Sequence, residues 1–538
     1  MVSNILKGAW IGLRQLSMNF FPDRPTKSFV THNLKTWRGT NNAPLPSGEI
    51  LYEHSSMQSS IIAYSYLANI LSNKYNATVR PYVIVNNASL LYRAYHYFLR
   101  ESEKIYKSFG TGKPLIVCVS PADNQRAHEL FSELHPKLKN KRDIEQLEVG
   151  GVLFGDLIYD DFLKQSLVPT IDIHAAGFIS HLKQFLGLVV YWNRYFDTHD
   201  IKAVHVSHCV YKMAIVARLA IFRDIPAFQS NGTHVYRMNR RQLNAYTDFL
   251  HYHEVFKKLP GAIRGAGIEE ARRRLKRRFA GEVGLDMNYS KKSAFSGIQH
   301  ELLLEKSDRK KILIASHCFF DSPHPYGINF FPDFYEWITF LGNLSETTNY
   351  DWYIKTHPDF LPANKPIIQH FLKKYPKFNL LPSDASHHQL ITEGIDVALT
   401  VYGTIGFEYA ALGVPVINGS SVNPHSQCNF NINPKDVAEY KSVLENLDAI
   451  QLDINEIEIY EYYFMNNIYN TNNWLFDNYD QMEKDLGGYQ NQFTSRVYSY
   501  FLDKRTPEKH QEIINTLKTF IESGDFRLNT IHMKAINK

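Results

Sequence analysis

The stretch DVALTVYGTIGFEYAALGVPVIN, residues 396–418, reads as strand, tight turn, helix and second strand. The first apolar run ends at Val401, the chain turns at Tyr402 and Gly403, and a helix is expected from Thr404. Unpaired backbone N–H groups and the positive end of that helix would face whatever lies beyond the strand, which suits a phosphate or diphosphate. In open α/β sheets, ligands bind at this carboxyl edge.

Two further residues extend this expected phosphate site. Glu408 falls one turn into the helix, where a carboxylate can accept hydrogen bonds from both hydroxyls of a ribose. Upstream, His357 and Pro358 follow the strand WYIK; a histidine can donate to a phosphate, and the proline ends the strand. We expect both turns at one edge of a sheet. The alternative is an ordinary strand–turn–helix unit with a capping Thr404 and a solvent-facing Glu408.

Strands and helices alternate on both sides of this stretch. One series begins at EILYEH (49–54) and the helical SIIAYSYLANILSNKYN (60–76), and a second begins at KKILIASHCFF (310–320). Strand–helix–strand order is typical of parallel sheets with crossover helices. The sequence therefore predicts an α/β protein with two doubly wound, Rossmann-like domains facing a cleft, and extra helices at both termini.

The changes in pattern also divide the chain into segments. We predict an extension over 1–47, a first Rossmann-like domain over 48–285, a polar linker over 286–308, a second Rossmann-like domain over 309–450, and a helical region over 451–538 that packs back on both domains.

The composition argues against some classes of binding partner. Hydrophobic residues make up 44% and charged residues 21% of the 538 positions, as in a folded globular protein. With 59 basic against 54 acidic residues, the net charge of +5 is too even to indicate a nucleic-acid-binding face. The four cysteines, Cys118, Cys209, Cys318 and Cys428, lie far apart without CxxC spacing, so we expect free thiols and no metal site.

The sequence also bears on location. It has no apolar run of about 18 residues, so we expect a cytoplasmic protein without a membrane span. Residues 4–21 can form an amphipathic helix that lies on the inner face of the cell membrane, or one that docks on the protein itself.

Several motifs together resemble a known family. HPD (357–359), GTIGFEYAALGVPVI and NPH (423–425) are similar to motifs of the bacterial capsule and surface-polysaccharide biosynthesis glycosyltransferases. That family has a GT-B-like fold and is related in pattern to Kdo transferases and sialyltransferases. The similarity spans about residues 48–450 and includes FGDLIYDDFLK (154–164), SHCVYKMAIVARLAIFRDIPAF (207–228) and SHCFFDSPHPYG (316–327).

The resemblance implies transfer of a sugar from a nucleotide-sugar donor to a growing capsule or lipopolysaccharide, with an oligosaccharide or lipid-linked glycan as acceptor. The implied reaction is inverting and needs neither a metal nor a cofactor. Sialyltransferases and Kdo transferases commonly carry a Ser-Ser or Ser-Thr pair where this chain has Gly403 and Thr404, so CMP, UDP and GDP all stay open. The implied nucleotide-binding residues are His357, Gly403, Thr404 and Glu408, with His425 and Asp321 nearby.

An inverting transferase needs a carboxylate or histidine that deprotonates the acceptor hydroxyl. In the first domain, Asp160 is favoured because it matches the family's aspartate, and Glu53 and His208 are the other candidates. Each of the three can instead serve as a capping or hydrogen-bonding residue. Two other functions remain compatible with the predicted fold: a sugar-nucleotide 2-epimerase or hydrolase, and a non-catalytic scaffold of a capsule assembly complex.

Overall fold

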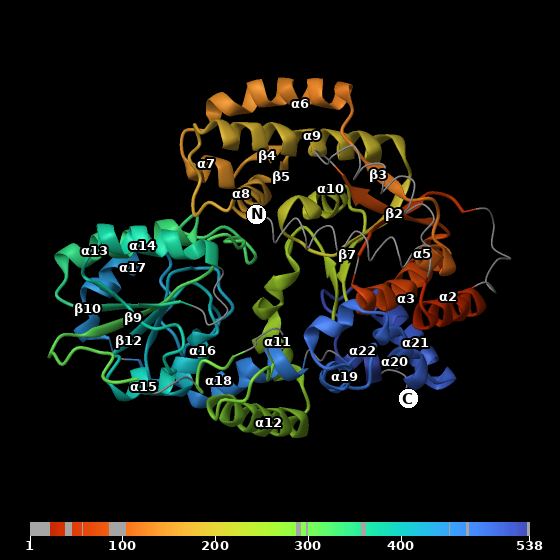
Figure 1. Ribbon diagram of the computed structural model, residues 1–538. Helices are drawn as coiled ribbons and strands as arrows, with labels where there is room; N and C mark the ends of the chain where they lie inside the picture. Colours follow the sequence, from red (N-terminus) through yellow and green to blue (C-terminus); the bar gives the residue numbers. More distant parts are fainter. Residues whose placement is uncertain are drawn as a thin grey trace.

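The structure is a computed structural model (Figure 1). It describes residues 22–37, 46–55, 57–85, 104–286, 292–296, 300–356, 362–450, 452–469 and 473–534.

The first half of the chain builds a six-stranded sheet in the order β3-β2-β1-β6-β7-β8. All neighbours pair in parallel except β7 and β8, which form an antiparallel edge. The chain winds outward from β1 to β3 and then returns to β6 on the other side of β1, so the order reverses between β1 and β6. The strands are β1 (Glu49–Glu53), β2 (Thr78–Ile84), β3 (Leu115–Val117), β6 (Ile201–Val206), β7 (Ala227–Ser230) and β8 (Val235–Met238).

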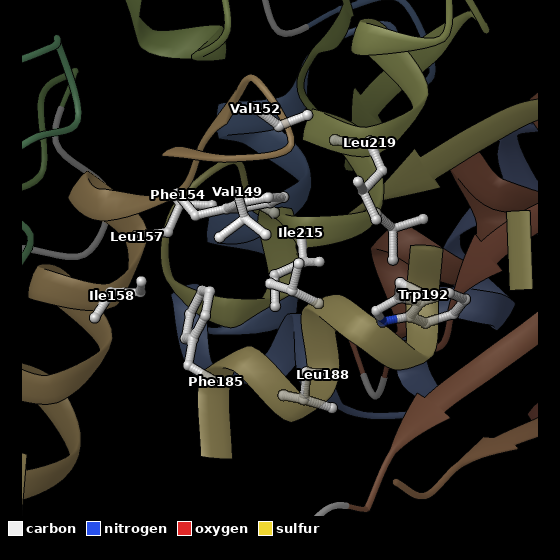
Figure 2. Packing of buried hydrophobic residues seen from close by; sticks show 14 of the residues in the cluster. Val149, Val152, Phe154, Leu157, Ile158, Phe185, Leu188, Trp192, Ile215 and Leu219 are labelled. Atoms are coloured by element: carbon white, nitrogen blue, oxygen red, sulfur yellow. The ribbon is translucent and has the colours of Figure 1, made fainter. Parts of the chain in front are cut away.

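Helices cover both faces of this sheet. Figure 2 shows side chains from a short hairpin and three helices converging in the core on one face, among them Phe154, Trp192 and Ile215. Gly155 opens α8 so close to the preceding helix that a Cβ there would lie 1.9 Å from the Ile144 carbonyl oxygen. The elements are α3 (Gln58–Tyr75), α5 (Lys104–Ser108), α6 (Pro121–Leu134), α7 (Lys141–Glu145), the hairpin β4 (Glu148–Val149) and β5 (Val152–Leu153), α8 (Gly155–Ser166), α9 (Ala176–Thr198) and α10 (Ile215–Phe222).

A second sheet of five parallel strands has the order β11-β10-β9-β12-β13. Its strands are β9 (Lys311–Ala315), β10 (Asp351–Lys355), β11 (Phe378–Leu380), β12 (Val397–Thr400) and β13 (Val416–Asn418). Its helices are α13 (Phe334–Thr347), α14 (Lys365–Lys374), α15 (His387–Thr392), α16 (Ile405–Ala411) and α17 (Val437–Glu445). The predicted fold class, two doubly wound α/β domains of GT-B type, is confirmed.

The remaining helices join the two halves. From the end of the first sheet, α11 (Tyr252–Lys258) and α12 (Gly261–Phe279) lead towards the second domain, where α18 (Glu456–Tyr463) packs on α12 and α16. The terminal helices then cross back to the first domain, with α20 on α2 and α21 on α3 (Figure 1). Those helices are α2 (Arg24–Trp37), α19 (Tyr479–Leu486), α20 (Arg496–Lys504), α21 (Pro507–Ser523) and α22 (Thr530–Lys534). Every helix within the described residues is too short or too polar to cross a lipid bilayer.

Candidate functional site

A pocket opens at the carboxyl edge of the second sheet. Because β9 lies between β10 and β12, the segments that follow these three strands meet there. Those segments line the pocket with Ser316 and His317 after β9, Lys355 and Thr356 at the end of β10, and Gly403 and Thr404 after β12. The polar segment 292–295 and the end of α12 form its outer wall.

The turn after β12 is as tight as its sequence predicts. A Cβ on Gly403 would lie 2.8 Å from Thr400 Oγ1, and the Gly403 N–H donates to that hydroxyl oxygen over 3.1 Å. The Gly403 N–H is therefore already used within the turn. Thr404 is exposed, and its side chain makes no capping hydrogen bond to the first turn of α16.

His317, which follows the neighbouring strand β9, makes hydrogen-bond contacts with this turn. Its Nε2 accepts a hydrogen bond from the Val401 N–H at 3.2 Å and lies 3.1 Å from Thr400 Oγ1. Since Nε2 is the acceptor, the ring carries its proton on Nδ1. The ring also stacks on Phe334 at a centroid distance of 4.6 Å. His317 thus holds the loop after β9 and the turn after β12 in a fixed relation.

Lys355 is a pocket residue that the sequence analysis did not single out. It ends β10, a strand whose five residues are all buried, and only 3% of its surface is exposed. Its Nζ donates to the Ser383 carbonyl oxygen at 3.1 Å. Burial lowers the pKa of Lys355 to about 8, although Asp384 and Glu408 act in the opposite sense. The available signal was a lysine that ends the otherwise apolar strand WYIK.

Glu408 lines the same pocket, but it is paired with Arg278 of α12. The Nε and Nη2 atoms of Arg278 lie 2.7 Å and 2.5 Å from the same oxygen, Oε1 of Glu408. Both side chains are largely buried. Arg278 belongs to the basic run 269–279, so the end of that helix supplies a second cation to the pocket.

Of the other three predicted nucleotide-binding residues, two lie outside this pocket and the third is not among the described residues. His357 falls outside the described residues. His425 is buried against α16, where a Cβ on Gly406 would lie 2.3 Å from its Nδ1, and burial lowers its pKa to about 3. Asp321 is exposed and accepts a hydrogen bond from the Tyr211 hydroxyl at 2.8 Å. Neither His425 nor Asp321 lines the pocket.

Asp160, the favoured catalytic base, lies in a contact between the two domains. Its Oδ1 is 2.5 Å from Nδ1 of His324, and its Oδ2 accepts from the Ser322 hydroxyl. Nε2 of His324 lies 2.8 Å from Oε1 of Glu145. Burial alone would lower the pKa of His324, but the two carboxylates raise it to about 10. Only 1% of the surface of Asp160 is exposed, so the residue faces the domain contact and not an open space.

Glu53 and His208 lie together at the carboxyl edge of the first sheet, where the strand order reverses. Glu53 ends β1 and accepts a hydrogen bond from the Ser207 N–H at 2.6 Å. Burial raises the pKa of Glu53 to about 7. His208 follows β6, is exposed, and has its Nδ1 3.4 Å from the Tyr246 hydroxyl. A carboxyl group with a pKa near 7 is suited to accept a proton at neutral pH.

Among the residues that the structure describes, no group of three or more His, Cys, Asp or Glu side chains is arranged to hold a metal ion. The four cysteines are free thiols.

Comparisons with known proteins give distant structural likenesses. Neither a protein-family model nor a curated protein matches the sequence. The β-Kdo 2,4-transferase KpsC of Thermosulfurimonas dismutans is similar at 13% identity and a TM-score of 0.30, over 49% of this chain and 79% of that chain. The UDP-GlcNAc 2-epimerase of Neisseria meningitidis, bound to UDP-GlcNAc, is similar at 14% identity and a TM-score of 0.22, over 85% of this chain and 99% of that chain. A Rickettsia africae glycosyltransferase is similar at 12% identity and a TM-score of 0.25, over 85% of this chain and 100% of that chain.

Proposed function

We propose that the protein is a glycosyltransferase that moves a sugar from a nucleotide-sugar donor to a bacterial surface polysaccharide, either capsule or lipopolysaccharide. The single observation that carries the proposal is the buried Lys355 in the pocket at the carboxyl edge of the second sheet.

A buried lysine is costly unless an anion compensates its charge. Of the two carboxylates that act on Lys355, Glu408 is already paired with Arg278. A phosphate group of a bound nucleotide would supply the missing negative charge through charge-assisted hydrogen bonds. Because Arg278 is paired with Glu408, Lys355 is the cation that this phosphate would meet, and UDP, GDP and CMP all stay open as the nucleotide.

The buried lysine also gives the pocket a role in the reaction. When the bond between the sugar and the phosphate breaks, negative charge develops on the leaving nucleotide. Fixed cations that face this charge stabilise the transition state. Lys355 would act in this way, and the Thr404 hydroxyl would donate its proton to a phosphate oxygen.

The acceptor would approach from the first domain. We assign the catalytic base to Glu53 because it ends β1 at the carboxyl edge of the first sheet, where the strand order reverses, and because burial raises its pKa to about 7. Glu53 removes the proton of the acceptor hydroxyl, the hydroxyl oxygen bonds to the anomeric carbon, and the nucleotide departs from the opposite face with inversion. Asp160 would then position the loop that carries Ser322 and His324, without contacting the acceptor.

Product analysis tests the proposal against its alternatives. The purified protein is incubated with UDP-, GDP- and CMP-sugars, with and without an oligosaccharide or lipid-linked acceptor, and nucleotide release and sugar products are followed by mass spectrometry. We expect acceptor-dependent nucleotide release and a lengthened glycan. An epimerised nucleotide sugar, free sugar without transfer, or nucleotide binding without turnover would each contradict the proposal, the last in favour of a scaffold.

A further inference from the structure

A second, larger cavity lies apart from the nucleotide pocket. It is a groove of about 960 Å³ between the segment after β8, helix α11 and the chain around α22. Its volume is near the upper end of the roughly 300–1,000 Å³ that small-molecule sites occupy. None of its lining residues belongs to the pocket at the second sheet or to the candidate bases.

The groove has an apolar lining that reaches the surface. Val255, Leu259, Met465 and Phe526 contribute buried or half-buried apolar side chains. Leu250 and Ile531 are 44% and 58% exposed, which is high for large apolar residues. Exposed apolar side chains that gather around a cavity indicate a ligand with an apolar part.

The charges of the groove are not balanced. It is lined by four cations (Arg240, Arg241, Lys258 and Arg527) and three carboxylates (Asp224, Asp248 and Asp525). Each carboxylate is engaged: Asp224 with Arg240 at 2.9 Å, Asp248 with Arg527, and Asp525 with His532 at 2.9 Å. Within the part of the chain that the structure describes, no carboxylate pairs with Arg241 or Lys258, and both are exposed.

The wall of the groove is built on buried contacts. Arg527 and Asp248 form a largely buried ion pair, and Asp248 also accepts from the Tyr252 hydroxyl at 3.0 Å. The Arg527 guanidinium lies 5.1 Å from the centre of the Tyr236 ring. These contacts fasten the chain around α22 to α11 and β8, so the groove is preformed.

We infer that this groove binds the lipid anchor of the acceptor: an anionic amphiphile whose hydrocarbon chain lies on the apolar lining and whose phosphate meets Arg241 and Lys258. Apolar surface next to Arg241 and Lys258, in a groove whose four cations exceed its three carboxylates by one, is complementary to a lipid phosphate. The inference rests on the proposed function only in calling this lipid part of the acceptor. The chemical character of the ligand, an apolar chain with an anionic group, follows from the lining of the groove itself.

Dodecyl phosphate, kept below its micelle concentration, is the probe. Calorimetric titration of the intact protein should give saturable binding to one site. Inorganic phosphate and the uncharged dodecyl maltoside should bind at least tenfold more weakly. The double variants Arg241→Gln/Lys258→Gln and Leu250→Ser/Ile531→Ser should each weaken dodecyl phosphate binding at least tenfold. The matched control Lys365→Gln/Lys373→Gln removes two exposed cations of α14 and should bind normally.

Unchanged affinity in both groove variants would overturn the inference. So would equal binding of dodecyl maltoside, or retention by phosphatidylglycerol vesicles without binding of monomeric dodecyl phosphate, which would make this face a bilayer-docking surface. Nucleotide titrations on the same preparations distinguish the two proposals, because Lys355→Met should weaken nucleotide binding at least tenfold and leave dodecyl phosphate binding intact.

Discussion

Lys355 should give nucleotide binding a distinctive pH dependence. Its pKa of about 8 in the free protein means that the cation is lost as pH rises through 8. Nucleotide phosphates are fully ionised above about pH 7. Affinity measured from pH 7 to 9.5 should therefore hold steady up to about pH 8 and then fall, by up to about tenfold per pH unit. A Lys355→Met variant should bind weakly with no such fall. A flat profile in the parent protein would remove Lys355 from the phosphate site.

The lowered pKa of Lys355 also makes the stability of the folded protein depend on pH. Between about pH 8 and the ordinary lysine value of 10.5, the unfolded chain holds more protons on this residue than the folded chain does. The contribution of Lys355 to the free energy of unfolding of the nucleotide-free protein therefore rises with pH across that window.

Glu53→Gln should separate chemistry from donor binding. The amide keeps the shape and can still accept from the Ser207 N–H, but it cannot take the acceptor's proton. Turnover should fall about 10²- to 10⁴-fold, with donor affinity unchanged. The parent rate should rise as pH increases through about 7, where Glu53 ionises, and the variant should lose that rise. Asp160→Asn and His208→Gln are the parallel variants, and a larger loss of turnover with normal stability in either would move the assignment to that residue.

The sequence predicted part of the pocket but not its cations. Gly403, Thr404 and Glu408 could be brought to one sheet edge because their positions follow from strand, turn and helix periodicity. The pairing of Glu408 with Arg278 joins residues 130 positions apart and depends on where α12 packs. The burial of Lys355 likewise depends on neighbours from separate segments, which local pattern does not reveal.

The loop between β9 and α13 fastens the second domain to α7 and α8 of the first. His324 lies between Asp160 and Glu145, and the three side chains are fully buried. His324→Gln would leave two buried carboxylates facing each other, with Arg142 still 3.2 Å from Glu145 but no cation between the two carboxylates. Breaking a buried charged pair in this way costs about 3–5 kcal/mol of unfolding free energy. Denaturant unfolding should report a loss of this size, whereas the exposed control His174→Gln should stay within about 0.5 kcal/mol.

The stabilising contribution of the His324 contact depends on pH. The pKa of His324 is raised from 6.5 to about 10, so its stabilising contribution is complete below about pH 6.5 and disappears as pH rises through 10. The difference in unfolding free energy between the parent and His324→Gln should shrink across that range. A difference that grows with pH, or a His324→Gln variant as stable as the parent, would contradict the charged contact.

The two domains and their connection were predictable to different degrees. Each sheet follows from its alternating pattern, and the reversal of strand order follows from the rules of doubly wound folds. The contact through His324 and the path of the terminal helices, with α18 on α16 and α21 on α3, unite elements that are not neighbours in the sequence (Figure 1). Such contacts depend on how whole elements pack together, and no local periodicity encodes them.

The central claim is that the pocket at the second sheet binds the nucleotide of a sugar donor through Lys355. Calorimetric titration of UDP, GDP and CMP into the parent, Lys355→Met and the exposed control Lys373→Met tests it directly. A charge-assisted contact of about 1.5–3 kcal/mol predicts that one nucleotide binds the parent and Lys373→Met equally, and Lys355→Met roughly 10- to 150-fold more weakly. Equal affinity in all three proteins, or a folded parent that binds none of the nucleotides, would contradict the account.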